Sequence, residues 1–195
     1  MIEFAIKHIP LITYQTSGDT YFIKKVNDCL FFSVIDIAGH GTRKCFFNAK
    51  RLKNIVENGI EILDFEKIFL EINKELTGNG AVVLIGKINT KTAKYEYSCI
   101  GNISVKKVDN KGYIEVLKTQ EGIVGIYLPM KIKKEKGILK NKEYLLFHTD
   151  GIKSNISLSK YFVYNKKLDN ILDMIIKKER NIDDALGLLM RYELE

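Results

Sequence analysis

The sequence has few cysteines and no long apolar run, and each shortage excludes a class of protein. Cys29, Cys45 and Cys99 are odd in number, lie far apart and form no C-x-x-C pair. They therefore indicate neither a disulfide framework nor a structural zinc site. No apolar run approaches the roughly 18 residues that a membrane-spanning helix requires. The N-terminal residues alternate like a strand and lack the apolar core of a signal peptide. The sequence therefore predicts a cytoplasmic protein.

The chain also lacks internal repeats, low-complexity segments and any linker rich in proline, glycine or serine, and it holds only 2 prolines. Its length of 195 residues suits one domain and is sufficient to bury a full hydrophobic core. The apolar fraction of 46% and the charged fraction of 28% are ordinary for a globular protein. We expect a single domain that spans residues 1–195.

Basic residues exceed acidic ones and give a net charge of +7. The lysines are densest in residues 131–142, where few aromatic residues accompany them. Surfaces that bind nucleic acid combine basic groups with stacking aromatics or with a recognition helix, and the sequence offers neither. A lysine-rich composition throughout the chain explains the charge, so we expect no nucleic-acid partner and no membrane. The charge can still steer an acidic or phosphorylated protein toward a site.

The apolar pattern predicts blocks of strands that enclose two neighbouring helices, followed by a last helix and a last strand. Alternating or short apolar runs predict strands at residues 2–9, 21–26, 30–37, 81–88, 94–100, 103–108, 113–117, 130–136, 143–149 and 185–192. Helical spacing predicts helices over residues 46–59, 65–76 and 168–178. Gly101-Asn102 is predicted as a hairpin turn. The pattern favours an α+β sandwich of two mainly antiparallel sheets with helices outside.

Aspartates stand at the ends of several apolar strands. Asp36 ends the run FFSVI, Asp150 ends the run YLLFHT, and Asp19 precedes the second strand. Asp183 and Asp184 open the last strand. Carboxylates that converge at one end of a sheet repel one another unless a cation compensates. Mg²⁺ and Mn²⁺ suit such an all-oxygen site, and a water bound to two metals is a nucleophile for phosphorus. Taken singly, each aspartate can instead be a turn former.

The order and spacing of these aspartates resemble the PPM (PP2C-like) phosphatase superfamily. The segments that carry the resemblance are Ser17-Gly18-Asp19, Asp36-Ile37-Ala38-Gly39-His40-Gly41, Thr149-Asp150-Gly151 and Asp183-Asp184-Ala185-Leu186. They match, in order, the family's G-G-D, D-x-x-G-H-G, S/T-D-G and D-D-x-T segments and span almost the whole chain. The bacterial SpoIIE/RsbU/RsbX branch is the most similar, and the short chain looks most like the RsbX type.

The resemblance implies an αββα sandwich and a site for two Mn²⁺ or Mg²⁺ ions. Asp36 would bridge the two ions and be the central catalytic residue. The other implied ligands are Asp19, the backbone carbonyl of Ile37, Asp150 and Asp183, with Asp184 as the alternative to Asp183. His40 could protonate the leaving oxygen, although its place between two glycines favours a structural role in a tight turn.

The implied activity is hydrolysis of phosphoserine or phosphothreonine in a protein by a metal-activated water. The RsbX-type likeness implies a substrate that carries a STAS domain or belongs to a stressosome. Ser17 and Leu186 depart from the family's glycine and threonine, and this leaves open a catalytically silent module that binds a regulatory protein. A hydrolase of small phosphoesters would use the same site with a different pocket.

Overall fold

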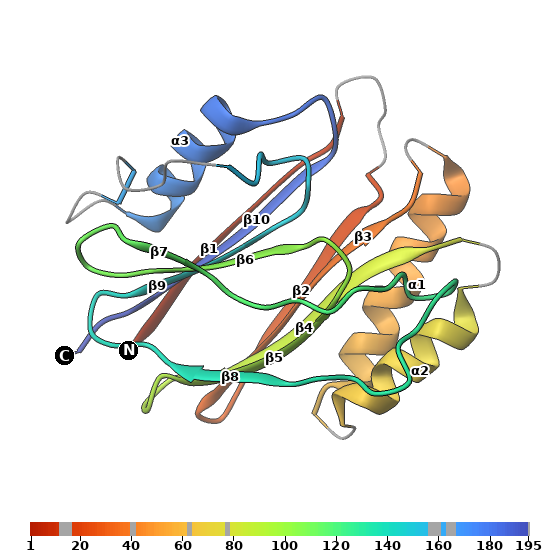
Figure 1. Cartoon of the computed structure of the whole chain (residues 1–195), viewed down its shortest axis with the longest axis horizontal. Coiled ribbons are helices and arrows are strands. Elements are labelled where there is room, and N and C mark those ends of the chain that lie inside the picture. The colour runs from red at the N-terminus through yellow and green to blue at the C-terminus, as the bar shows by residue number, and fades with distance from the viewer. Residues whose placement is uncertain are drawn as a thin grey trace.

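Two five-stranded sheets pack face to face, and helices cover both outer faces of the sandwich (Figure 1). The structure, a computed structural model, describes residues 1–11, 17–39, 42–61, 64–76, 79–155, 161–162 and 167–194. Every pairing between neighbouring strands is antiparallel. The expected α+β class and αββα layering are confirmed.

One sheet departs from the order of the strands along the chain, and the other follows it. One sheet has the order β1 (Ile2–Ile9), β10 (Ala185–Tyr192), β9 (Tyr144–His148), β6 (Ser104–Val108) and β7 (Ile114–Val116). The other has the order β2 (Asp19–Val26), β3 (Cys29–Ile37), β4 (Ala81–Asn89), β5 (Lys94–Ile100) and β8 (Glu135–Ile138). The first and last strands of the chain are therefore neighbours.

Two helices begin directly after residues whose side chains cap them. Helix α1 (Arg43–Gly59) is capped by Thr42, whose side chain accepts the Cys45 N–H at 3.2 Å. Asp64 caps α2 (Phe65–Glu75) in the same way. Helices α1 and α2 cover the sheet that contains β2 and β3, and α3 (Leu168–Glu179) covers the other sheet (Figure 1).

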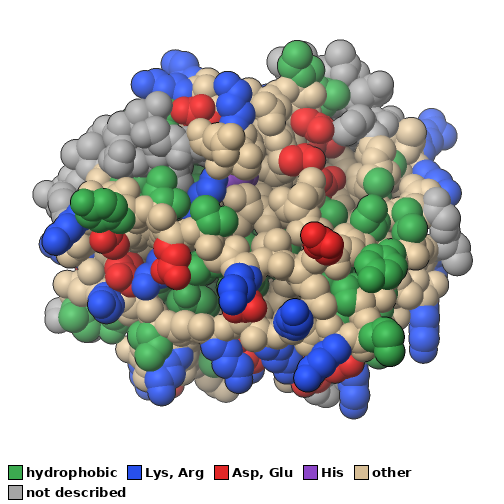
Figure 2. All heavy atoms as spheres, in the orientation of Figure 1, with side chains coloured by type: hydrophobic (Ala, Val, Ile, Leu, Met, Phe, Trp, Pro, Cys, Tyr) green, Lys and Arg blue, Asp and Glu red, His purple; other side chains and the backbone are tan. Residues whose placement is uncertain are grey.

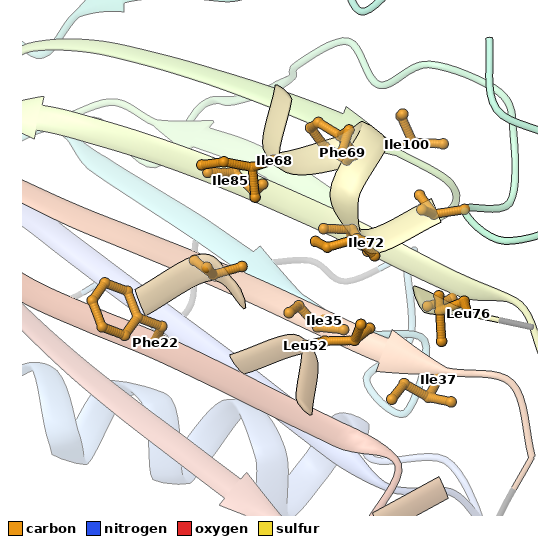
Figure 3. Packing of buried hydrophobic residues seen from close by; sticks show 14 of the residues in the cluster. Phe22, Ile35, Ile37, Leu52, Ile68, Phe69, Ile72, Leu76, Ile85 and Ile100 are labelled. Carbon is orange, nitrogen blue, oxygen red and sulfur yellow. The ribbon is translucent and has the colours of Figure 1, made fainter. Parts of the chain in front are cut away.

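The core has three layers, one between the sheets and one beneath each set of helices. Figure 3 shows Ile35 and Ile85 of the sheet packed under Leu52 of α1 and Phe69 of α2. Apolar residues that alternate along β3 and β4 point to the helices and to the other sheet in turn, so both faces of these strands are buried. This double burial fixes the strand ends that carry the aspartates.

Two expectations about chain path are wrong. The strand expected at residues 130–136 begins only at Glu135. The Gln120 side chain donates to the Lys131 carbonyl at 2.8 Å and accepts the Lys133 N–H at 3.1 Å. These backbone groups therefore bond to a side chain and not to a neighbouring strand. Gly101-Asn102 is not a hairpin turn, because β5 and β6 belong to different sheets. A Cβ at Gly101 would overlap Val82, so glycine is needed where the chain crosses.

The helices give no sign of a membrane span: within the described ranges, none is long and apolar enough to cross a bilayer.

Candidate functional site

Asp19 and Asp36 face each other across two neighbouring strands. Asp19 opens β2 and pairs in register with Asp36 near the end of β3. The Asp19 side chain is buried, with 3% of the residue exposed, and Asp36 is half-buried. The Thr149 hydroxyl donates to Asp19 Oδ2 at 2.8 Å and so joins the end of β9 in one sheet to β2 in the other. The site therefore lies where the two sheets meet.

Gly18 allows the backbone before Asp19 to approach the end of β3 closely. A Cβ at Gly18 would lie 2.9 Å from the Ile37 carbonyl oxygen and 3.1 Å from that of Gly39. The Gly18 carbonyl accepts the Ile37 N–H at 3.3 Å. The glycine thus brings the Ile37 carbonyl, an expected metal ligand, beside the segment that carries Asp19.

Ser17, which stands where the family has glycine, has a definite role. It is buried, and its hydroxyl oxygen accepts the Asp19 N–H at 3.0 Å. The side chain therefore satisfies a buried backbone donor without displacing the carboxylate. Leu186, the other departure, is buried between the sheets, and its N–H donates to the Thr149 hydroxyl at 3.0 Å. Neither departure removes a carboxylate from the site.

The adjacent residues Asp183 and Asp184 are placed differently. Asp184 is 5% exposed, and its two carboxylate oxygens accept the N–H groups of Leu11 at 2.6 Å and of Gly18 at 2.8 Å. Asp183 is half-buried, and its Oδ1 accepts the Asp184 N–H at 2.7 Å. Asp184 therefore ties the last strand to the segment before Asp19. Which of the pair is a metal ligand stays a prediction.

Asp150 has an exposed side chain, and two asparagines hold it. Asn102 Nδ2 donates to Asp150 Oδ2 at 3.1 Å, and Asn181 Nδ2 donates to the Asp150 carbonyl at 2.6 Å. The Asn181 N–H also donates to the Gly151 carbonyl at 2.8 Å. Sequence reasoning missed both asparagines, since each looks like an ordinary turn residue and their approach to Asp150 arises only in the fold.

The carboxylates interact strongly. Burial raises the pKa of Asp19 well above its ordinary value, and the negative charges of Asp36, Asp184 and Asp150 raise it further, while the hydrogen bond from Thr149 opposes the shift. Figure 2 shows one group of acidic side chains near the upper edge of a face on which acidic and basic side chains are otherwise interspersed. A bound divalent cation would relieve this repulsion.

These residues fit a hard cation such as Mg²⁺ or Mn²⁺, because their side chains offer oxygen ligands and excess negative charge. No three His, Cys, Asp or Glu side chains in the described segments are already arranged to hold an ion. The expected residues Asp19, Asp36, Ile37 and Asp150 lie at one end of the sandwich with Asp184. His40 lies outside the described residues.

The raised pKa of Asp19 predicts how the stability of the metal-free protein depends on pH. Since the folded state binds this proton more tightly than the unfolded state, stability should fall as pH rises from the ordinary aspartate value, about 4, through the raised folded value. Thermal unfolding in EDTA across this range, with Asp19→Asn as the comparison, measures the effect. The variant should lose less stability with rising pH, and equal slopes for the two proteins would contradict the prediction.

Comparisons with known proteins agree with this architecture. A search of curated proteins finds no match. The family model described as stage II sporulation protein E (SpoIIE) matches residues 27–192. The chain belongs to the SpoIIE family. The match covers three of the four aspartate segments and ends near the close of β10, so the SpoIIE assignment rests on nearly the whole sandwich.

Solved structures show the same fold. A structure from a study of the bacterial stressosome superposes with a TM-score of 0.84 at 24% identity, covering 97% of this chain and 98% of that chain. RsbX in complex with magnesium gives 0.82 at 21% identity, covering 97% and 94%. The PP2C phosphatase domain of SpoIIE from Bacillus subtilis gives 0.76 at 16%, covering 99% of this chain and 63% of that chain. At these identities the likeness shows the PP2C-like fold alone.

Proposed function

We propose that this SpoIIE-family protein is a metal-dependent phosphatase that hydrolyses phosphoserine or phosphothreonine in a protein. The observation that carries the proposal is the buried Asp19, whose pKa is raised by burial and by the charges of Asp36, Asp184 and Asp150 at the junction of the two sheets. Such a cluster is costly without a cation, and perturbed carboxylates mark functional sites. The family and the fold of its phosphatase neighbours support the same reading.

The residues that would hold two Mn²⁺ or Mg²⁺ ions are Asp19, Asp36, the Ile37 carbonyl, Asp150 and Asp183, with Asp184 as the alternative to Asp183. Bound ions of this kind lower the pKa of a water and neutralise charge on the phosphate. The RsbX neighbour, described in complex with magnesium, supports the choice of metal.

The chain's own residues orient the carboxylates. The Thr149 hydroxyl donates to Asp19 Oδ2 and so fixes the orientation of that carboxylate. Asn102 orients Asp150 in the same way, through Oδ2. Water would attack phosphorus directly, since the proposed mechanism uses no side chain as a nucleophile.

The proposed substrate is a phosphorylated regulatory protein of the STAS-domain or stressosome type, and the enzyme would be RsbX-like. Two fold neighbours, RsbX and the structure from the stressosome study, support this choice. The net charge of +7 would favour approach of an acidic phosphoprotein.

Phosphate release from a phosphorylated STAS-domain protein tests the proposal. We expect turnover that requires Mn²⁺ or Mg²⁺ and stops in EDTA. Free phosphate is measured with phosphoserine peptides and small phosphoesters as parallel substrates. If the folded protein releases no phosphate with either metal but still binds the partner, the silent binding module is correct and the phosphatase proposal is wrong.

A further inference from the structure

A lysine and a histidine are buried together on the outer face of the sheet that carries Asp150. Lys106 on β6 is 3% exposed and His148 on the neighbouring β9 is 1% exposed. Lys106 Nζ lies 3.2 Å from His148 Nε2 and donates to the Ser154 carbonyl at 2.6 Å. His148 Nδ1 lies 2.9 Å from the Thr149 carbonyl oxygen. The pair thus contacts the backbone on both sides of Asp150-Gly151.

The partners of His148 determine where its proton lies. A carbonyl oxygen only accepts hydrogen bonds, so Nδ1 must carry the proton that it shares with Thr149. An ammonium group only donates, so Nε2 must be the bare acceptor that faces Lys106. The histidine is therefore a neutral ring with its proton on Nδ1. It accepts a hydrogen bond from Lys106 through Nε2 and donates one to the Thr149 carbonyl through Nδ1.

The burial of Lys106 lowers the stability of the folded state. Burial lowers the pKa of Lys106, and no carboxylate in the described ranges forms an ion pair with it. An ammonium group removed from water without a counter-charge destabilises the folded state. An apolar side chain of similar length would fill the same space without that cost, so stability does not account for the lysine.

The buried Lys106 is explained instead by its contact with the turn that carries Asp150. The Asp150 side chain is exposed, so packing does not fix it. Asn102 orients its carboxylate through Oδ2, and its place also depends on the backbone from Thr149 to Ser154. Asn181 holds the Asp150 and Gly151 carbonyls from the side of α3. Lys106 and His148 hold the carbonyls of Ser154 and Thr149 from the side of the sheet.

We propose that Lys106 and His148 are positioning residues that clamp the 149–154 turn and so set the place of Asp150 for metal binding. This inference rests on the proposed function, because it assigns a purpose to the clamp at the same metal site. Their hydrogen bonds go to each other and to backbone carbonyls of the turn. The clamp acts only through the backbone of the turn.

Mn²⁺ binding by Lys106→Met tests the clamp without any need for catalysis. Free Mn²⁺ is measured by its electron paramagnetic resonance signal, and the melting temperature is measured in EDTA. We expect the Mn²⁺ concentration for half-saturation to rise about tenfold, as for other residues that orient metal ligands indirectly. The melting temperature should stay the same or rise, because a buried charge has been removed.

Lys107→Met is the matched control. Lys107 is the next residue of β6, and its Nζ pairs with Glu143 at 3.0 Å, away from the turn. This variant should melt at a lower temperature and bind Mn²⁺ like the wild type. Unchanged Mn²⁺ binding by Lys106→Met, or equal losses of binding in both variants, would overturn the clamp. A wild-type protein that binds no Mn²⁺ would instead overturn the proposed function.

Nitrogen-15 NMR of the wild-type protein gives a second test, which stands even if Lys106→Met does not fold. The His148 ring should show a protonated Nδ1 and an unprotonated Nε2 at neutral pH. A proton on Nε2 would exclude donation from Lys106 and would also overturn the clamp.

Discussion

Asp36→Asn is expected to reduce metal-dependent phosphate release by about 1,000-fold or more, which corresponds to roughly 4 kcal/mol of transition-state stabilisation. The amide keeps an oxygen but loses the negative charge with which Asp36 would help to hold the ions. The fold should survive, because Asp36 faces Asp19 across β2 and β3 and its charge raises the pKa of Asp19. Removing that repulsion should leave the metal-free protein as stable as the wild type or more stable. Turnover at saturating Mn²⁺ and thermal unfolding in EDTA measure the two effects.

Asp28→Asn provides the comparison for this variant. Asp28 lies in the turn at the other end of the β2–β3 hairpin, where it pairs with Lys91 at 2.8 Å. Exposed ion pairs contribute little to stability, so this variant should keep nearly full activity. Near wild-type turnover of Asp36→Asn would remove Asp36 from the centre of the site. An equal loss in Asp28→Asn would show that the assay reports damage to the hairpin.

The apolar pattern was sufficient to predict the strand ends that carry aspartates, and the family resemblance implied the αββα layers. Nearly continuous apolar runs mark β3 up to Asp36 and β9 up to Thr149, and two packed sheets with helices outside bury such strands well. The cross-strand pairing of Asp19 with Asp36 follows from the short turn at residues 27–28, since the turn fixes the register of the hairpin. Local chemistry therefore specifies this half of the site.

The remainder of the site depends on contacts between distant segments, which a local pattern does not record. Asn102 reaches Asp150 only because Gly101 lets the chain cross between the sheets. Lys106 on an apolar strand resembled one of many surface lysines, yet it is buried beside His148. The Leu11 and Gly18 N–H groups can donate to the Asp184 carboxylate only because the last strand lies next to the first.

The carboxylate cluster and the buried Lys106 both lower the stability of the metal-free protein. The like charges around the buried Asp19 and the buried ammonium of Lys106 both weaken the metal-free fold. A cation that binds only the folded state offsets the first of these and adds stability that grows with the logarithm of its concentration over its dissociation constant. If the proposed function is correct, the stability of the protein should therefore depend strongly on the concentration of the metal ion.

Gly151→Ala is expected to destabilise the protein by about 3 kcal/mol or more, a fall in melting temperature of about 6–12 °C for a chain of this size. Gly151 does not have a left-handed backbone, so the cost comes from space alone. A Cβ there would overlap the carbonyl group of Asp184, and both partners are backbone in the turn and strand that carry the site. The backbone must therefore move, and Mn²⁺ binding should weaken with it.

Gly187→Ala separates this effect from the general cost of replacing a buried glycine. A Cβ at Gly187 would meet the side-chain ends of Leu172 at 2.9 Å and Ile152 at 3.4 Å, which can rotate away, so its cost should stay below about 1 kcal/mol. Urea unfolding and Mn²⁺ titration of both variants give the comparison. Equal stability of the two variants would show that the turn at Asp150 yields easily. In that case the close approach of Gly151 to Asp184 could not be what fixes Asp150 at the site.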